Sequence, residues 1–378
     1  MGKYKIIISG GGTGGHIFPA LAIANELCNR FPDAEILFIG AENRMEMERI
    51  PAAGYRILGL PVAGFNRKNM LKNISVAMRL ITSLRMARKI IREFKPDFAI
   101  GVGGYASGPT LWMASSLHIP ILIQEQNSYA GLTNKLLGKR ATKICVAYKD
   151  MQRYFPADRI VITGNPVRKE LETAVEKTGE AFRYFGLETG KPILLVVGGS
   201  LGARTINNSI NKGLASLIDA GIQVIWQTGK TPPELDSVTI HTPRNGDPRC
   251  QTQPLPTGLW VSDFISRMDY AYSIADLVIS RAGACTLSEL SILKKAAILV
   301  PSPNVAENHQ TMNARTLSDS QAAILIPDIL AEEQLAATAI ELLNDKARLS
   351  ELSVNIATFA QYNSAQRIVD EALYLIGR

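Results

Sequence analysis

Cysteine is scarce in this chain of 378 residues, and its four copies are scattered with no Cys-x-x-Cys pair. This spacing argues against a disulfide framework and against a zinc site, and it favours a reducing cytoplasm. Long apolar runs are absent as well, since none reaches the ~18–20 residues that span a bilayer. The start of the chain lacks the shape of a signal peptide. We therefore expect a globular chain that does not cross a membrane.

Acidic residues are missing from the segment 65–92. Its basic residues are Arg67, Lys68, Lys72, Arg79, Arg85, Arg88, Lys89 and Arg92. Apolar residues alternate with them at helical spacing, which predicts a basic amphipathic helix that could lie on an anionic membrane. The alternative is a surface helix that packs its apolar stripe on a sheet. Nucleic acid is not expected as a partner, because Phe65 is the segment's only aromatic residue and no recognised binding module accompanies it.

The chain is long enough for two domains. Short apolar runs alternate with helical patterns, as is typical of α/β proteins with mostly parallel sheets covered on both faces. We predict two Rossmann-like, doubly wound domains: residues 1–165, onto which the segment 361–378 packs back, and residues 166–360. The first holds 22 basic and 11 acidic residues, and the rest of the chain holds 19 and 23. The resulting net charges of +11 and −4 suggest that the first domain faces an anionic partner.

The stretch 280–313 combines a predicted phosphate-binding helix N-terminus with polar groups that suit a sugar. An apolar run at 277–279 predicts a buried strand, and Gly283, Thr286 and Ser288 open the helix that follows. A helix N-terminus favours a phosphate, and Glu289 is placed to accept hydrogen bonds from a ribose diol. Polar residues in the loop 301–314 suit sugar hydroxyls. The stretch therefore predicts a nucleotide-sugar site, and the alternative is an ordinary turn between strand and helix.

Three further glycine-rich loops, at 10–16, 101–109 and 198–204, each follow a predicted strand. Ligands of open α/β sheets bind at such strand ends. The first loop satisfies Gly-x-Gly-x-x-Gly, and Glu42 follows the next strand, where a ribose-binding acid would sit. A dinucleotide oxidoreductase is therefore one alternative, although it would leave the third loop and the polar groups after residue 280 without a task.

A series of motifs then carries a resemblance: GGTGGH, GGYASGP, EQN with AGLTNK, GNPVR, GGSLGAR, and GACTLSE with HQTMNA, in this order. With them the chain resembles the MurG family of bacterial glycosyltransferases over nearly its whole length. The resemblance implies the GT-B architecture of two domains facing a cleft. It also implies transfer of N-acetylglucosamine (GlcNAc) from UDP-GlcNAc to undecaprenyl-pyrophosphoryl-MurNAc-pentapeptide (lipid I), with no cofactor, at the cytoplasmic face of an anionic cell membrane. Another UDP-sugar transferase and a non-catalytic sugar-nucleotide binding module are the alternatives.

The resemblance also assigns residues. Arg168 and Ser200 would meet the UDP phosphates, the Ile265 backbone the uracil, Glu289 the ribose and Gln310 the sugar hydroxyls. The complete donor set is Thr13, Gly14, Gly15, Asn127, Arg168, Ser200, Ile265, Ala284, Cys285, Thr286, Leu287, Ser288, Glu289 and Gln310. The acceptor set is Gly103, Gly104, Tyr105 and Ser107. Departures from the family are Cys285 in place of a larger apolar residue, His309 in place of Gln, and a longer proline-rich loop at 230–259.

The implied reaction inverts the sugar linkage, so the acceptor C4 hydroxyl needs a general base. His16 is the first candidate, because an unperturbed histidine pKa of about 6.5 suits proton abstraction near neutral pH; it could instead orient the glycine loop or bind the acceptor pyrophosphate. Glu125 is the second candidate, or else a carboxylate that fixes the loop of Asn127. No Asp-x-Asp occurs, so no metal held by the protein is expected, and a helix N-terminus with Arg168 would stabilise the departing UDP.

Overall fold

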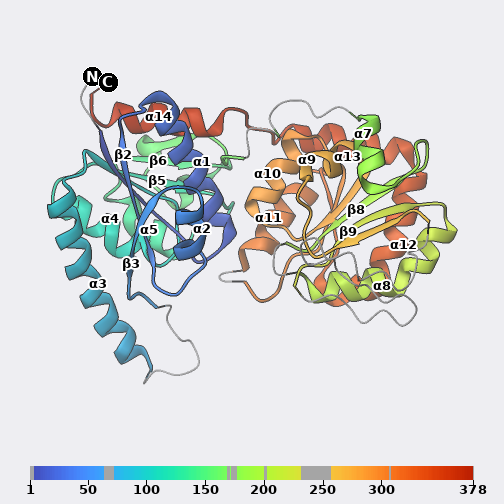
Figure 1. The fold of residues 1–378 in the computed structure, drawn as a ribbon, viewed down its shortest axis with the longest axis horizontal. Coiled ribbons are helices and arrows are strands. Elements are labelled where there is room, and N and C mark those ends of the chain that lie inside the picture. Colours follow the sequence, from blue (N-terminus) through green and yellow to red (C-terminus); the bar gives the residue numbers. More distant parts are fainter. Residues whose placement is uncertain are drawn as a thin grey trace. The chain divides into compact units, whose positions relative to one another are not determined.

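The computed structural model describes residues 4–63, 72–167, 171, 177–199, 202–230, 257–305 and 308–377. The chain divides into two compact units. Unit 1 consists of Met1–Arg168 with Gln361–Arg378, and unit 2 consists of Lys169–Ala360. Figure 1 shows a strand-rich centre covered by helices in each of them.

Unit 1 is built on a seven-stranded parallel sheet with the order β3-β2-β1-β4-β5-β6-β7. Its strands are β1 (Lys5–Ser9), β2 (Glu35–Ala41), β3 (Arg56–Leu60), β4 (Phe98–Gly101), β5 (Ile121–Glu125), β6 (Lys143–Val146) and β7 (Ile160–Ile162). The register places Ile7 of β1 between Leu37 of β2 and Ala99 of β4. Both sides of β1 are buried, which explains why its sequence is a continuous apolar run.

The helices of unit 1 cover both faces of this sheet. They are α1 (Gly14–Arg30), α2 (Glu46–Ala52), α3 (Lys72–Phe94), α4 (Ser107–Ser116), α5 (Leu132–Gly138) and α14 (Ser364–Tyr374), with short 3₁₀ turns η1 (Met151–Arg153) and η2 (Ala157–Arg159). Ile6 and Ile8 of β1 share a core with α1 and α14, whereas Ile7 shares the opposite core with α3, α4 and α5. The C-terminal helix is further tied to the first part of the chain, because Arg30 forms an ion pair with Asp370.

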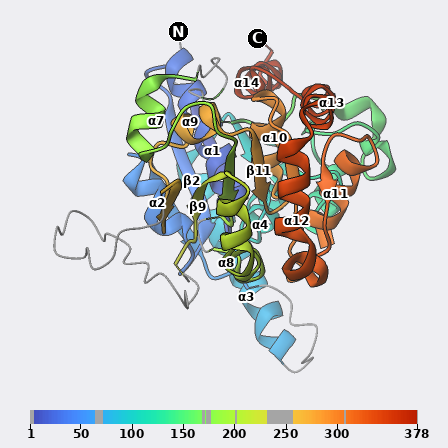
Figure 2. The ribbon, with the colours of Figure 1, turned by 90° about the vertical axis from the view of Figure 1, so that its right-hand side faces the viewer.

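Unit 2 contains a six-stranded parallel sheet with the order β10-β9-β8-β11-β12-β13. Its strands are β8 (Ile193–Val197), β9 (Gln223–Gln227), β10 (Leu259–Ser262), β11 (Leu277–Ser280), β12 (Ala297–Leu299) and β13 (Ile324–Leu325). Its helical elements are α7 (Gly179–Phe185), α8 (Arg204–Asp219), α9 (Met268–Ile274), α10 (Ala284–Ile292), α11 (His309–Ser318), η4 (Asp328–Leu330), α12 (Ala331–Asn344) and α13 (Lys346–Ala357). α8 and α12 lie side by side on one face, as Figure 1 and Figure 2 show.

The structure confirms the predicted fold class of two parallel-sheet α/β domains. It differs from the sequence-based prediction in detail. The first helix begins at Gly14 rather than at Phe18, because the Thr13 carbonyl already accepts from the N–H groups of His16 and Ile17 at 3.1 and 3.2 Å. Most of the loop predicted at 230–259 lies outside the described residues.

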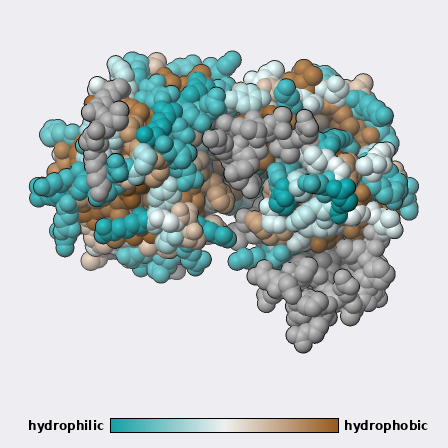
Figure 3. Space-filling model, turned by 45° about the horizontal axis from the view of Figure 1, so that its top comes forward, coloured by the Kyte–Doolittle hydropathy of each residue, from teal (hydrophilic) through white to brown (hydrophobic). Residues whose placement is uncertain are grey.

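On the face drawn in Figure 3, hydrophilic residues are mixed with smaller groups of hydrophobic ones. In the part of the chain that the structure describes, no helix is both long enough and apolar enough to cross a membrane.

Candidate active site

Each sheet has one point at which its strand order reverses. In unit 1 this switch point lies between β1 and β4, and in unit 2 it lies between β8 and β11. Ligands of open parallel sheets bind beyond the carboxyl ends of the strands at such a point. The three glycine-rich loops and the loop that begins at Arg281 follow these same four strands, so each unit has a candidate ligand site of its own.

His16 lies in the first turn of α1, beside the glycine loop that follows β1. Its Nδ1 atom is 3.0 Å from the Gly11 carbonyl oxygen and 3.3 Å from Thr13 Oγ1. A carbonyl oxygen can only accept, so Nδ1 carries the hydrogen in this bond. The neutral imidazole then has its basic lone pair on Nε2. This tautomer suits a group that takes a proton from a substrate hydroxyl.

The loop after β4 touches the glycine loop closely. Gly103 and Gly104 both adopt left-handed backbone angles, with φ of +95° and +88°. A Cβ atom on Gly103 would lie 2.8 Å from Nε2 of His16, and one on Gly104 would lie 2.4 Å from the Gly11 carbonyl oxygen. Ser107 donates to the Gly104 carbonyl at 2.9 Å, and Tyr105 is exposed. The structure thus brings His16 together with the four residues predicted for the acceptor.

The Glu125 carboxylate is almost entirely buried at the end of β5. Its two oxygens accept hydrogen bonds from the backbone and side-chain nitrogens of Asn127, from the Gly131 N–H and from Asn134 Nδ2, at 2.9 to 3.2 Å. Burial raises the pKa of the Glu125 carboxyl above its ordinary value. Because four donors point at this carboxylate, the geometry favours its alternative role, which is to fix the loop of Asn127.

In unit 2 the glycine loop after β8 is tied to Ile265 by one side chain. Gln227 Nε2 donates to the Gly199 carbonyl at 3.2 Å, and Gln227 Oε1 accepts from the Ile265 N–H at 3.2 Å. The backbone that was predicted to meet the uracil is therefore fixed by Gln227. Arg168 and Ser200, which were predicted to meet the UDP phosphates, lie outside the described residues.

The N-terminus of α10 forms the other side of this switch point. Ala284, Cys285 and Thr286 make its first turn, where a helix leaves N–H groups without partners in the helix itself. The Leu287 side chain is buried, and its N–H donates to the Gly283 carbonyl at 3.0 Å. Ser288 Oγ donates to the Ala284 carbonyl at 3.0 Å. The first three of these residues are therefore best placed to meet a phosphate.

Glu289 and Gln310 are each held by a neighbouring group. The hydroxyl of Tyr272, a buried residue of α9, donates to Glu289 Oε2 at 3.0 Å. Gln310 Oε1 accepts from the Ser302 N–H at 2.8 Å, which links the start of α11 to the loop after β12. These bonds orient the two side chains that were predicted to hold the ribose and the sugar.

Several residues that shape the site were missed by the sequence analysis. Glu46 is a fully buried carboxylate that accepts from the Gly12 N–H of the glycine loop and from the Ala41 N–H at the end of β2. Tyr272 orients Glu289, and Asp328 accepts from both Arg281 and Thr205, joining the loop after β11 to the first turn of α8. Each of these partners is distant in sequence from the residue it holds. No local pattern could have found them, and Glu46 even stands in a charged run typical of surface.

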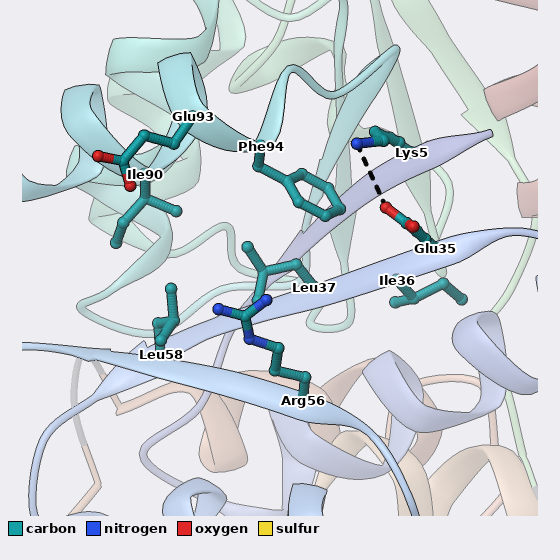
Figure 4. Close-up of a pocket in the computed structure, with 9 residues that line it drawn as sticks. All are labelled: Lys5, Glu35, Ile36, Leu37, Arg56, Leu58, Ile90, Glu93 and Phe94. Atoms are coloured by element: carbon teal, nitrogen blue, oxygen red, sulfur yellow. Dashed lines mark ion pairs between the residues drawn. The ribbon is translucent and has the colours of Figure 1, made fainter. Parts of the chain in front are cut away.

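A cavity of about 400 Å³ lies at the opposite edge of the unit 1 sheet (Figure 4). It is lined by Lys5, Glu35, Ile36, Leu37, Arg56, Leu58, Ile90, Glu93 and Phe94. Lys5 and Glu35, which are paired on neighbouring strands, form an ion pair of 3.3 Å at one side of it. The cavity lies by the amino-terminal ends of β1 to β3 and contains none of the predicted site residues, so it is not part of the candidate active site.

Two parallel-sheet units, each with a glycine loop at its switch point, define the GT-B class of glycosyltransferases. The glycosyltransferase family 28 N-terminal domain matches residues 6–146, and the family 28 C-terminal domain matches residues 193–368. The chain belongs to glycosyltransferase family 28 and, within it, to the MurG family.

Individual relatives agree with this placement. The chain is 60% identical over 378 residues to the UDP-N-acetylglucosamine–N-acetylmuramyl-(pentapeptide) pyrophosphoryl-undecaprenol N-acetylglucosamine transferase of Parabacteroides distasonis, covering 100% of both chains. It is 56% identical over 377 residues to the transferase of the same name from Porphyromonas gingivalis, covering 99% of this chain and 96% of that one. The crystal structure of Acinetobacter baumannii MurG matches with a TM-score of 0.76 and 26% identity, covering 99% of this chain and 100% of that chain.

Proposed function

We propose that this glycosyltransferase moves GlcNAc from UDP-GlcNAc to the C4 hydroxyl of MurNAc in lipid I, which yields lipid II for peptidoglycan synthesis. The observation that carries the proposal is the 60% identity to a transferase of that name over the complete length of both chains. The two candidate sites at the switch points support it, because a nucleotide donor and a pyrophosphate acceptor each need an anion-binding site.

Unit 2 is the proposed donor domain. The first turn of α10 would meet the UDP phosphates, together with Arg168 and Ser200. Glu289 would accept from the ribose hydroxyls, and Gln310 would bond to the GlcNAc. An α-linked donor and a β-linked product imply a single in-line displacement at C1. The positive end of α10 would stabilise the charge that develops on UDP as the bond to the sugar breaks.

Unit 1 is the proposed acceptor domain. His16 would take the proton of the C4 hydroxyl through Nε2, which is the basic nitrogen in the tautomer that the Gly11 carbonyl selects. The loops at 10–15 and 103–107 would bind the acceptor's pyrophosphate, and Tyr105 would help to position the sugar. Asn127, held by Glu125, would reach the donor sugar together with Thr13, Gly14 and Gly15.

A membrane-facing surface on unit 1 is the remaining part of the proposal. The helix α3 buries Ala87 and Ile91 in the sheet core, but near its start it exposes Met78 and Ile81 (67% and 50%). Figure 1 and Figure 2 show this first part of α3 projecting beyond the rest of unit 1. Helix α5 exposes two more large apolar side chains, Leu132 and Leu136. The same helix α3 and the two residues directly after α5 carry exposed basic side chains: Arg79, Arg85, Arg88, Lys89, Lys139 and Arg140.

This combination of apolar and basic groups suits a peripheral position on the anionic cytoplasmic face of the cell membrane, where a lipid-linked acceptor resides. The two interpretations of the segment 65–92, a membrane-binding helix and a surface helix packed on the sheet, are thus combined in α3. Its later half packs Ala87 and Ile91 on the sheet and presents its exposed basic side chains to the anionic surface, and its earlier half offers apolar side chains to the bilayer.

Calorimetric titration of the protein with UDP, UDP-GlcNAc, UDP-glucose and NADH tests the donor assignment. We expect the uridine ligands to bind, with the N-acetylated sugar preferred over glucose. Glu289→Ala should lower the affinity for all three uridine ligands. Glu332→Ala, a change at an exposed acid on α12, should leave these affinities unchanged. Binding of NADH alone would overturn the transferase proposal in favour of an oxidoreductase.

A further inference from the structure

The carboxylate of Glu46 is buried against the glycine loop of unit 1. Glu46 is fully buried, its Oε2 accepts from the Gly12 N–H at 2.8 Å, and its Oε1 accepts from the Ala41 N–H at 3.0 Å. Two glycines make room for it. A Cβ atom on Gly11 would lie 2.1 Å from Glu46 Oε1, and one on Gly40 would lie 2.7 Å from Glu46 Cγ. Burying a charge in this way costs free energy, and the proposed mechanism assigns no role to Glu46.

A single peptide group separates Glu46 from His16. The N–H of Gly12 and the C=O of Gly11 belong to the same planar amide. The N–H donates to Glu46, and the C=O accepts from His16 Nδ1 at 3.0 Å. A carboxylate that binds one end of an amide polarises it, so the oxygen at the other end becomes a stronger acceptor. The three groups therefore form a chain of hydrogen bonds that runs from a negative charge to the imidazole.

We propose that Glu46 is a positioning residue for His16. By polarising and fixing the Gly11–Gly12 peptide group, it holds the ring hydrogen on Nδ1 and so keeps the basic lone pair on Nε2. The peptide group takes the place that a carboxylate occupies when it binds a catalytic histidine directly. The functional part of this inference rests on the proposed role of His16 as general base, but the effect on the tautomer doesn't depend on it.

Nuclear magnetic resonance of the protein with ¹⁵N-labelled histidine tests the tautomer without any substrate. Long-range proton–nitrogen correlations distinguish the two ring nitrogens, and His16→Gln identifies the His16 signals among the four histidines. We expect neutral His16 to carry its hydrogen on Nδ1 in the native protein. Glu46→Gln replaces one carboxylate oxygen by an amide NH₂, which cannot accept from a backbone N–H. The tautomer population of His16 should therefore shift toward hydrogen on Nε2. An unchanged tautomer in Glu46→Gln would overturn the proposal.

A double-mutant cycle tests whether Glu46 acts through His16. We expect Glu46→Gln to lower kcat by about 10-fold or more, since general bases contribute at least ~100-fold. The affinity for UDP should be unchanged, because the contacts proposed for the uracil, the ribose and the first turn of α10 lie in unit 2. The contacts proposed for Thr13, Gly14 and Gly15 are to the GlcNAc, which UDP lacks. In the His16→Ala background the same change should cost less than about 2-fold, because coupled residues are not additive. Equal losses of kcat in both backgrounds would show that Glu46 only supports the structure of the loop and does not act through His16.

Two controls complete the cycle. Glu48→Gln alters an exposed acid of the same helix and should leave kcat and the tautomer as they are. If Glu46→Gln doesn't fold, Glu46→Asp takes its place in both experiments, since it keeps the charge and shortens its reach. A His16→Ala variant with full activity would refute the general base while leaving the magnetic resonance result to decide on Glu46.

Discussion

At the scale of single residues, the hydrogen bond between Tyr272 and Glu289 leads to a prediction about the donor. The phenol donates to one carboxylate oxygen at 3.0 Å and so fixes the direction of the other. Tyr272→Phe removes this hydrogen bond. We expect the affinity for UDP to fall by about 5-fold, which corresponds to roughly 1 kcal/mol for one hydrogen bond. The loss should be smaller for 2′-deoxy-UDP, which offers Glu289 one hydroxyl less. Calorimetric titration with both nucleotides measures the difference.

Tyr270→Phe is the matched control for this prediction. Tyr270 lies on the same helix, and its hydroxyl donates to Glu180 at 2.9 Å, away from Glu289. This variant should bind both nucleotides as the native protein does. Equal weakening by the two tyrosine variants would show that the helix, rather than the bond to Glu289, determines affinity.

The residue scale is also where the sequence was least informative. His16, Glu289 and Gln310 could be singled out because they stand in recognisable motifs. Glu46, which bonds to the glycine loop beside His16, and the partners of Glu289 and Gln310, which are Tyr272 and the Ser302 N–H, could not be found, because folding brings each to its place. Glu125 shows the same limit. Its position was predicted, but only the four donors around its carboxylate distinguish a loop anchor from a proton acceptor.

At the scale of elements, helix α3 yields a prediction about membranes. Changing Arg85, Arg88 and Lys89 together to Glu should lower binding to vesicles of phosphatidylglycerol and phosphatidylcholine by about 10-fold or more. The reason is that each basic residue near an anionic surface contributes about 1 kcal/mol. Vesicle sedimentation measures binding, and turnover of a short-chain, water-soluble acceptor should stay as in the native protein.

The control for α3 changes the net charge by the same amount elsewhere. Lys191, Lys212 and Lys346 are exposed residues of unit 2, and their change to Glu should leave vesicle binding nearly intact. If both triple variants lost binding equally, net charge alone would explain the association. If neither lost binding, the surface on α3 and α5 would not be a membrane face.

Elements were predicted well where their sequence carries its own signal. The buried strands of both sheets are runs of branched apolar residues, and their alternation with helices identified the parallel α/β class. The two-residue strand β13 and the seven-residue helix α2 carry too little pattern to be seen. Helix α2 matters nonetheless, because its first residue is Glu46. The order of strands, and hence the switch points, depends on pairing between distant segments and became visible only in the fold.

At the scale of the whole molecule, the chain carries two sheets, each with a candidate ligand site, and an uneven charge. Residues 1–165 have a net charge of +11 and the remainder has −4. This distribution suits a division of labour in which unit 1 meets an anionic membrane and a pyrophosphate acceptor, while unit 2 holds the nucleotide.

Direct product analysis tests the central claim of lipid-linked GlcNAc transfer. The protein is incubated with UDP-GlcNAc and a short-chain lipid I, and the acceptor is then analysed by mass spectrometry. We expect an acceptor heavier by one N-acetylhexosamine with UDP released in equal amount, and no product from an acceptor that lacks the C4 hydroxyl. Release of UDP without a modified acceptor, or equal transfer to the 4-deoxy acceptor, would contradict the account.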